Sequence, residues 1–81
     1  MTREEINEKM TSIFRQTFNE PELVLNDAMT ANDVDSWDSL SHMLMIAQVE
    51  EAFGIKFRLR EMNGMNTVGD IIACVETKVN A

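Results

Sequence analysis

The chain of 81 residues is long enough for one small domain but too short for a deep active-site cleft, since such a chain buries only about 60% of its unfolded surface. With 44% hydrophobic and 26% charged residues, it is expected to fold as a single domain over residues 1–81 despite a net charge of −7. The single cysteine, Cys74, excludes an intramolecular disulfide framework, and no Cys/His cluster has metal-ligand spacing. The acidic, amphipathic N-terminus and the lack of a long apolar run indicate a cytoplasmic protein without membrane insertion.

Charge is distributed unevenly along the sequence. Residues 16–55 contain no Lys or Arg, yet this stretch holds acidic residues throughout: Glu20, Glu22, Asp27, Asp33, Asp35, Asp38, Glu50 and Glu51. Such a field repels nucleic acid and anionic lipid, and it speeds encounter with basic protein surfaces. The alternative is a set of solvated acids that only aid solubility.

The N-terminal third contains one predicted helix and one long loop. Thr2 and Glu5 have capping-box spacing, and Pro21 ends the helix at the latest. Its apolar positions recur near helical period: Ile6, Met10, Ile13, Phe14 and Phe18. Residues 19–35 are rich in turn formers and unusually long for a loop, so they either contain a short helix or serve a function. We expect the apolar residues of this loop to hold it against the bundle: Leu23, Leu25 and Met29.

A second helix is predicted from about Ser39 to Phe53, followed by Gly54 as a left-handed C-terminal residue. Its apolar residues form two stripes. The expected core stripe contains Met45, Ile46, Val49 and Phe53, and the other contains Leu40, Met43, Leu44 and Ala47. Because a small bundle cannot easily cover both, part of the second stripe is a candidate exposed patch, unless the long loop covers it.

Residues 55–60 alternate like a strand but have no partner strand, so an extended connection is expected, with Ile55 and Phe57 in the core. A short helical turn over 59–63 should end at Gly64. Thr67 and Asp70 then form a capping-box pair ahead of a last helix with apolar residues at helical spacing: Val68, Ile71, Ile72, Val75 and Val79. The predicted fold is all-α, a small four-helix bundle of three main helices and one short helix, with a long loop between the first two.

Two catalytic or metal-binding interpretations of the acidic and hydroxyl residues fail. A calcium loop starting at Asp33 would place Asp38 where glycine is required and Leu44 where glutamate is required. As a nucleophile, Ser39 would need a base that a third group orients, and the only histidine is His42, three residues later. Ser39 also lacks the flanking glycines of a nucleophile elbow. We therefore expect no catalytic residue and no metal site, and we expect His42 to be a surface residue of the second helix. An ordinary helix cap by Asp38 or Ser39 remains compatible with the sequence.

The region over residues 33–43, followed by the helix that ends in Glu-Glu-Ala-Phe, resembles the attachment-site region of the acyl carrier proteins. The similarity continues through residues 67–70 and the last helix, so it covers essentially the whole chain. It implies that Ser39 carries a 4'-phosphopantetheine arm from coenzyme A, with acyl groups held on its thiol as thioesters, and that Asp38 and Leu40 orient and anchor the turn. A phosphodiester at the first residue of a helix also meets unpaired amides and the positive dipole end. Ser36 also follows an aspartate, but it lacks the following leucine.

The same resemblance implies a monomeric carrier that is not an enzyme and that binds no nucleic acid. Its partners would be a phosphopantetheinyl transferase and acyl-loading and acyl-transfer enzymes with basic docking patches. They would bind the second helix through Leu40, Met43, Leu44, Ala47, Glu50 and Glu51.

Two departures from the fatty-acid carriers indicate a dedicated lipid, polyketide or polysaccharide pathway. Ser41 and Leu44 stand where acids are usual, and the third segment carries Lys56, Arg58 and Arg60. The alternatives are a peptidyl or aminoacyl carrier and, from a different class, an unmodified acidic helical adaptor.

Overall fold

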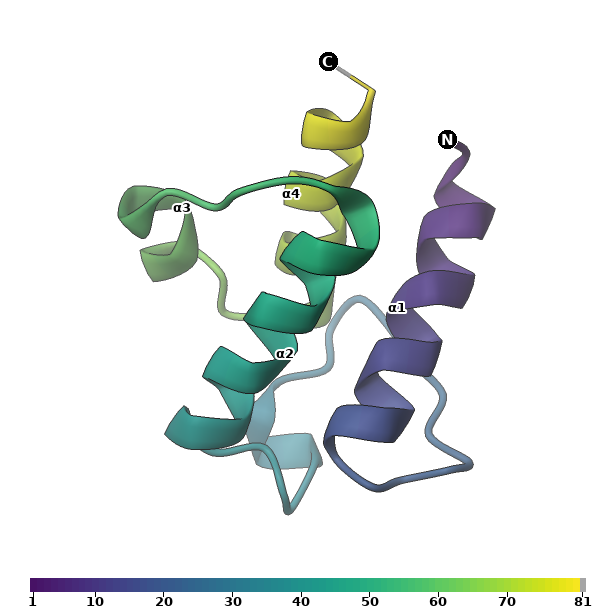
Figure 1. Ribbon diagram of the computed structural model, residues 1–81. Coiled ribbons are helices and arrows are strands. Elements are labelled where there is room, and N and C mark those ends of the chain that lie inside the picture. The colour runs from purple at the N-terminus through teal and green to yellow at the C-terminus, as the bar shows by residue number, and fades with distance from the viewer. Residues whose placement is uncertain (81) are drawn as a thin grey trace.

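The computed structural model describes residues 1–80, which form α-helices and one short 3-10 helix without any β-strand. The elements are α1 (Arg3–Thr17), η1 (Ala31–Asp33), α2 (Ser39–Phe53), α3 (Leu59–Asn63) and α4 (Val68–Val79). Helix α1 packs against both α2 and α4, while the short α3 lies to one side of α2 and α4 (Figure 1). The prediction of an all-α bundle with three main helices, one short helix and a long first loop is confirmed.

Capping boxes define where the long helices begin. The Thr2 hydroxyl accepts a hydrogen bond from the Glu5 backbone N–H at 3.1 Å, and the Glu5 carboxylate accepts from the Thr2 N–H at 3.0 Å. Thr67 and Asp70 make the same reciprocal pair ahead of α4. Each box satisfies two backbone N–H groups that the helix itself leaves unpaired, so these two predicted starts are confirmed.

The core is an apolar cluster to which every long helix contributes. Its buried residues are Ile6, Met10, Ile13, Phe14, Phe18, Met29, Val34, Trp37, Met45, Ile46, Val49, Phe57, Val68, Ile71, Ile72 and Val75. Around Phe14, the rings of Phe18 and Trp37 lie edge-on at centroid distances of 5.4 and 5.3 Å. Phe53, expected in the core, is only half-buried, because it lies at the last turn of α2 with the Lys9 ammonium 5.6 Å from its ring centroid.

The long loop between α1 and α2 is anchored to the start of α4. The backbone N–H groups of Val68 and Gly69 donate to the carbonyls of Met29 and Asp27 at 2.9 and 3.0 Å. A Cβ at Gly69 would lie 3.0 Å from the Asp27 backbone oxygen and Cβ, so this close approach favours glycine. The loop contains η1 and contributes Met29 to the core, with Leu23 and Leu25 partly buried, as predicted.

The extended connection after α2 is held by the helix that precedes it. Gly54 ends α2 with φ +65°, in the left-handed conformation predicted for it. The Phe57 N–H then donates to the Glu50 carboxylate at 2.9 Å, and the Phe57 ring enters the core. This contact holds the segment that leads into α3.

Candidate functional site

The first turn of α2 is fixed by a capping box made from Asp38 and Ser41. The Asp38 carboxylate accepts from the Ser41 backbone N–H at 2.9 Å, and the Ser41 hydroxyl oxygen accepts from the Asp38 N–H at 2.8 Å. The Ser41 backbone N–H is the main reason that the pKa of Asp38 is lowered, and the Ser41 hydroxyl adds to the effect. Asp38 is therefore an ionised N-cap that sets the geometry of the residue after it.

Three serine hydroxyls lie close in sequence to this turn, but only one is left available. The Ser36 hydroxyl donates to the Phe18 carbonyl at 2.7 Å, and the Ser41 hydroxyl donates to the Ser36 carbonyl at 2.7 Å. Ser39 is exposed, and its hydroxyl makes no hydrogen bond with any group among residues 1–80. The structure thus presents the Ser39 hydroxyl to solvent at the positive end of a helix of 15 residues.

Beside this serine, Trp37 and His42 form a stacked, hydrogen-bonded pair. The Trp37 Nε1–H donates to His42 Nδ1 at 3.0 Å, and the rings lie nearly parallel, 11° apart, at a centroid distance of 6.0 Å. Burial lowers the pKa of His42, in keeping with a neutral imidazole whose Nδ1 accepts a hydrogen bond. His42, expected to be a surface residue, is half-buried, and its partner is Trp37 rather than Ser39.

An open, largely apolar hollow lies next to Ser39. It is lined by η1, by the start of α2 and by the segment before α4, through Ala31, Trp37, Asp38, Ser39, His42, Met43, Met65 and Asn66. The sequence did not predict this hollow, because Met65 lies far from Ser39 along the chain. It places an apolar surface next to the Ser39 hydroxyl.

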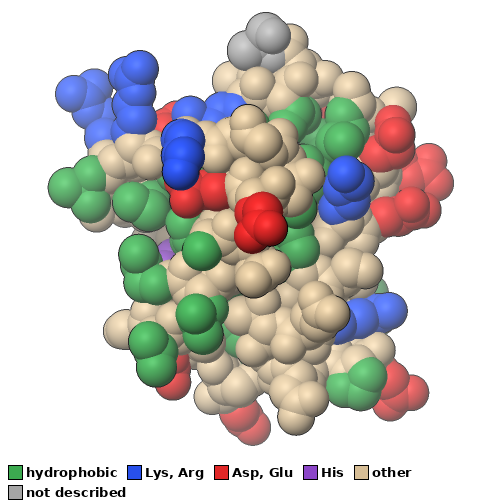
Figure 2. Space-filling view, viewed as in Figure 1, with side chains coloured by type: hydrophobic (Ala, Val, Ile, Leu, Met, Phe, Trp, Pro, Cys, Tyr) green, Lys and Arg blue, Asp and Glu red, His purple; other side chains and the backbone are tan. Residues whose placement is uncertain are grey.

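The second apolar stripe of α2 is exposed. Leu40, Met43 and Leu44 are 74%, 55% and 56% exposed, and Ala47 and Glu51 are exposed as well. Figure 2 shows hydrophobic side chains gathered on the left of the view, over α2 and α3. The predicted exposed patch is confirmed, and the long loop does not cover it. Glu50 differs from its neighbours because it is half-buried and its carboxylate is bound to the Phe57 N–H.

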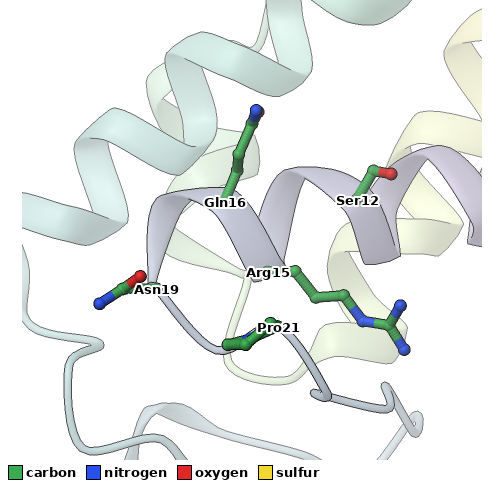
Figure 3. Close-up of a pocket in the computed structure, with 5 residues that line it drawn as sticks. All are labelled: Ser12, Arg15, Gln16, Asn19 and Pro21. Atoms are coloured by element: carbon green, nitrogen blue, oxygen red, sulfur yellow. The ribbon is translucent and has the colours of Figure 1, made fainter.

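A second hollow, at the C-terminal end of α1, lacks the features of a site. It is lined by Ser12, Arg15, Gln16, Asn19 and Pro21, and the side chains of Arg15 and Gln16 leave α1 in different directions (Figure 3). The Arg15 Nε–H donates to the Leu23 carbonyl at 2.7 Å, so this guanidinium helps to hold the long loop.

Two further features of residues 1–80 concern metal binding and membrane insertion. This part of the chain has no group of three or more His, Cys, Asp or Glu side chains placed to hold a metal ion. None of its helices is both long enough and apolar enough to span a membrane.

Comparison with known proteins identifies the family of this chain. A sequence profile described as the phosphopantetheine attachment site matches residues 8–75. An acyl carrier protein from Rhodococcus erythropolis is 36% identical over 76 residues, which cover 93% of this chain and 82% of that protein. This chain belongs to the acyl carrier protein family.

Other acyl carrier proteins agree in sequence and in fold. A meromycolate extension acyl carrier protein from Mycolicibacterium smegmatis is 33% identical over 76 residues, covering 93% of this chain and 76% of that protein. A solution structure of a holo acyl carrier protein from Geobacter metallireducens superimposes with a TM-score of 0.87 and 42% identity, covering 91% of this chain and 85% of that one. The prosthetic group of the acyl carrier described here is therefore a covalently attached phosphopantetheine, as predicted.

Proposed function

We propose that Ser39 is the attachment residue and that the protein carries acyl groups as thioesters on a 4'-phosphopantetheine arm. The observation that supports this assignment most directly is the state of the three nearby hydroxyls. The Ser36 and Ser41 hydroxyls donate hydrogen bonds to backbone carbonyls of the fold. Ser39, in contrast, is exposed, and its hydroxyl makes no hydrogen bond within residues 1–80. Modification of Ser39 would break no contact made by its hydroxyl in the described protein.

The start of α2 also suits the charge of the phosphodiester. The backbone N–H groups of the first helical turn and the helix dipole favour an anion there. The Asp38 carboxylate is held by the Ser41 N–H, so it closes the cap and orients Ser39. The Ser39 hydroxyl oxygen forms the new bond to phosphorus, its proton is lost to a base of the transferase, and the adenosine bisphosphate part of coenzyme A leaves. Once attached, the arm supplies the thiol on which acyl groups are held.

Partner enzymes would recognise α2 next to this serine. The exposed apolar patch follows directly on Ser39, and Glu51 adds an exposed carboxylate at its far end. A phosphopantetheinyl transferase and acyl-loading enzymes with basic surfaces would contact Leu40, Met43, Leu44, Ala47 and Glu51. Glu50 would contribute less than predicted, since its carboxylate is already bound to the Phe57 N–H.

The pathway is proposed to be a dedicated one, in lipid, polyketide or polysaccharide synthesis. The exposed Leu44 on α2 and the basic residues before and within α3 distinguish this surface from that of a fatty-acid carrier with continuous acids. Acyl rather than aminoacyl cargo is favoured because the relatives matched above are acyl carriers. Efficient loading by amino acid ligases alone would reverse this choice of cargo.

Intact mass spectrometry tests the assignment of Ser39. After incubation with coenzyme A and a promiscuous phosphopantetheinyl transferase, the wild-type protein should gain one arm and Ser39→Ala none. Ser36→Ala is the matched control and should still gain the arm, with circular dichroism showing that all three proteins are helical. A mass gain in Ser39→Ala, or no gain in the wild type, would show that the assignment is wrong.

A further inference from the structure

The basic residues of this acidic protein fall into two groups. Of the seven Lys and Arg residues, four are engaged by other parts of the fold. Arg3 and Lys78 form ion pairs with carboxylates at 3.0 to 3.6 Å, Arg15 donates to a backbone carbonyl at 2.7 Å, and Lys9 lies over an aromatic ring. These four cations act within the fold.

The other three, Lys56, Arg58 and Arg60, lie within five consecutive residues and are all exposed. None of them forms an ion pair with a carboxylate of residues 1–80. Between the two arginines, Leu59 is 71% exposed at the first position of α3. We call these four residues the α3 face. It combines uncompensated positive charge with an exposed leucine.

The nearest acid on α3 does not neutralise this face. The Glu61 carboxylate accepts from the Arg58 backbone N–H at 2.7 Å and pairs with the Lys78 ammonium at 3.0 Å. These contacts, with the Arg58 N–H first, lower the pKa of Glu61 and keep it ionised in that role. Figure 2 shows Lys and Arg side chains at the upper left of the molecule, beside hydrophobic ones in the region of α3.

We propose that the α3 face is a docking surface for a protein partner that offers an apolar pocket rimmed by carboxylates. Leu59 fills the pocket, while Arg58 and Arg60 contact the acidic rim. Arginine is suited to this role because its planar guanidinium binds carboxylates in a bidentate way and is weakly hydrated. The proposal rests on the proposed function, in that the partner is the acyl-loading enzyme that also contacts α2.

The charges of the molecule favour a protein over two other occupants. An anionic membrane is normally bound by clusters of about four to eight basic residues, and this face has three on a protein of net charge −7. A second copy of the chain carries the same net charge, so two copies repel each other at long range. A local acidic patch on another protein meets neither obstacle.

Such a face also selects among partners. An enzyme with an uninterrupted basic surface would bind the acidic part of the carrier but would meet like charges at α3. The repulsion at α3 would lower the affinity of that enzyme for the carrier. An enzyme that is basic opposite α2 and acidic opposite α3 would bind the carrier more tightly. The pattern therefore separates the enzymes of this pathway from those that serve other carriers.

Kinetics with the loading enzyme test the proposal. The enzyme is purified from the producing cell by its ability to acylate the holo protein, so that its isolation does not depend on binding. Arg58→Gln/Arg60→Gln should raise the KM for the holo carrier about tenfold, equal to about 1.4 kcal/mol, with kcat unchanged. The control Lys9→Gln/Asn7→Asp makes the same change in net charge on the exposed side of α1 and should leave KM within about twofold.

Cross-linking identifies the chemistry of the contact. A zero-length carbodiimide reagent should join Lys56 to an Asp or Glu of the purified enzyme, and Lys56→Gln should abolish that product. Leu59→Ala should also raise KM without lowering the thermal unfolding midpoint, because this side chain is exposed. Equal KM values for the arginine variant and its control would overturn the proposal.

Three further outcomes would count against the α3 face as a protein-docking surface. They are binding to phosphatidylserine vesicles that requires Arg58 and Arg60, a dimer in sedimentation that the arginine variant abolishes, and the absence of any Lys56 cross-link to the enzyme. The arginine variant should still gain the arm from a promiscuous transferase, in the same mass assay as the wild type. Failure of the wild-type protein to gain the arm would overturn both proposals. An arginine variant that gains the arm but has an unchanged KM would overturn the α3 face alone.

Discussion

Both faces of α2 carry apolar residues, but only one of the two is buried. On the inner face, Met45 and Val49 are fully buried, whereas on the outer face Leu40 and Leu44 are more than half exposed. The inner face packs against α1, while no described element covers the outer one. A helix that is apolar on both faces but covered on one keeps the other available for a partner, because that surface loses its contact with water only in a complex.

The largest expected effect is the loss of an inner-face side chain. Met45→Ala should lower the free energy of unfolding by about 2–5 kcal/mol, because it removes a fully buried side chain and leaves a cavity. Urea denaturation followed by circular dichroism measures this change. A loss of less than about 1 kcal/mol would indicate that the inner face is not part of a tightly packed core.

An outer-face substitution should separate stability from partner binding. Leu44→Ala should change the free energy of unfolding by no more than about 0.5 kcal/mol, since the side chain is 56% exposed. The KM of the acyl-loading enzyme for this variant should rise, because an apolar contact of the complex is removed. A marked loss of stability with an unchanged KM would assign the outer face to the fold instead.

A smaller effect is expected at the edge between the two faces, where His42 binds Trp37. Burial lowers the pKa of His42 below 6.5, so the unfolded chain takes up the proton first, and stability should fall as the pH drops from about 6.5 to the folded-state pKa. Above pH 6.5 the neutral imidazole accepts the Trp37 hydrogen bond and this contribution is complete. Fluorescence of Trp37, the only tryptophan, should report the transition.

The matched variant for this titration is His42→Gln. It keeps a polar side chain next to Trp37 but cannot take up a proton in this range. A fluorescence transition that persists in His42→Gln would show that another group causes it.

The smallest effect concerns the cap that begins α2. The pKa of Asp38 is lowered below 3.8, chiefly by the Ser41 backbone N–H, so its ionised form stabilises the protein above that pH and the contribution disappears as the pH falls through the folded-state pKa. Asp38→Asn retains a capping side chain without the charge. Its stability should be slightly below that of the wild type at pH 7, and the difference should shrink as the pH is lowered from 3.8 toward 2. Parallel denaturation curves with a constant difference at both pH values would contradict this account.

Local sequence signals were sufficient to predict most of the fold. Thr2 and Glu5, like Thr67 and Asp70, have the spacing of a capping box, which is typical of a helix start, and Gly54 ends α2 for a reason that is local to its backbone. The two stripes of α2 follow from helical periodicity alone. The sequence also predicted which stripe enters the core, but it could not exclude that the long loop covers the other one, because that depends on the path of the loop.

The parts that the sequence did not predict are contacts between side chains and distant or unexpected partners. The hydrogen bond from the Phe57 N–H to the Glu50 carboxylate was not expected, since Glu50 had been considered only as a contact for a partner. His42 was expected at the surface, but the preceding turn brings Trp37 against it. Neither contact has a signature in spacing or composition, since each arises from the path of the backbone between the two residues.

The assignment of Ser39 is tested most directly on the protein taken from its own cell. Proteolysis and tandem mass spectrometry of that material should find 4'-phosphopantetheine on the peptide containing Ser39, with a cargo that hydroxylamine releases as expected for a thioester. An unmodified Ser39, or an arm on any other residue, would contradict the account.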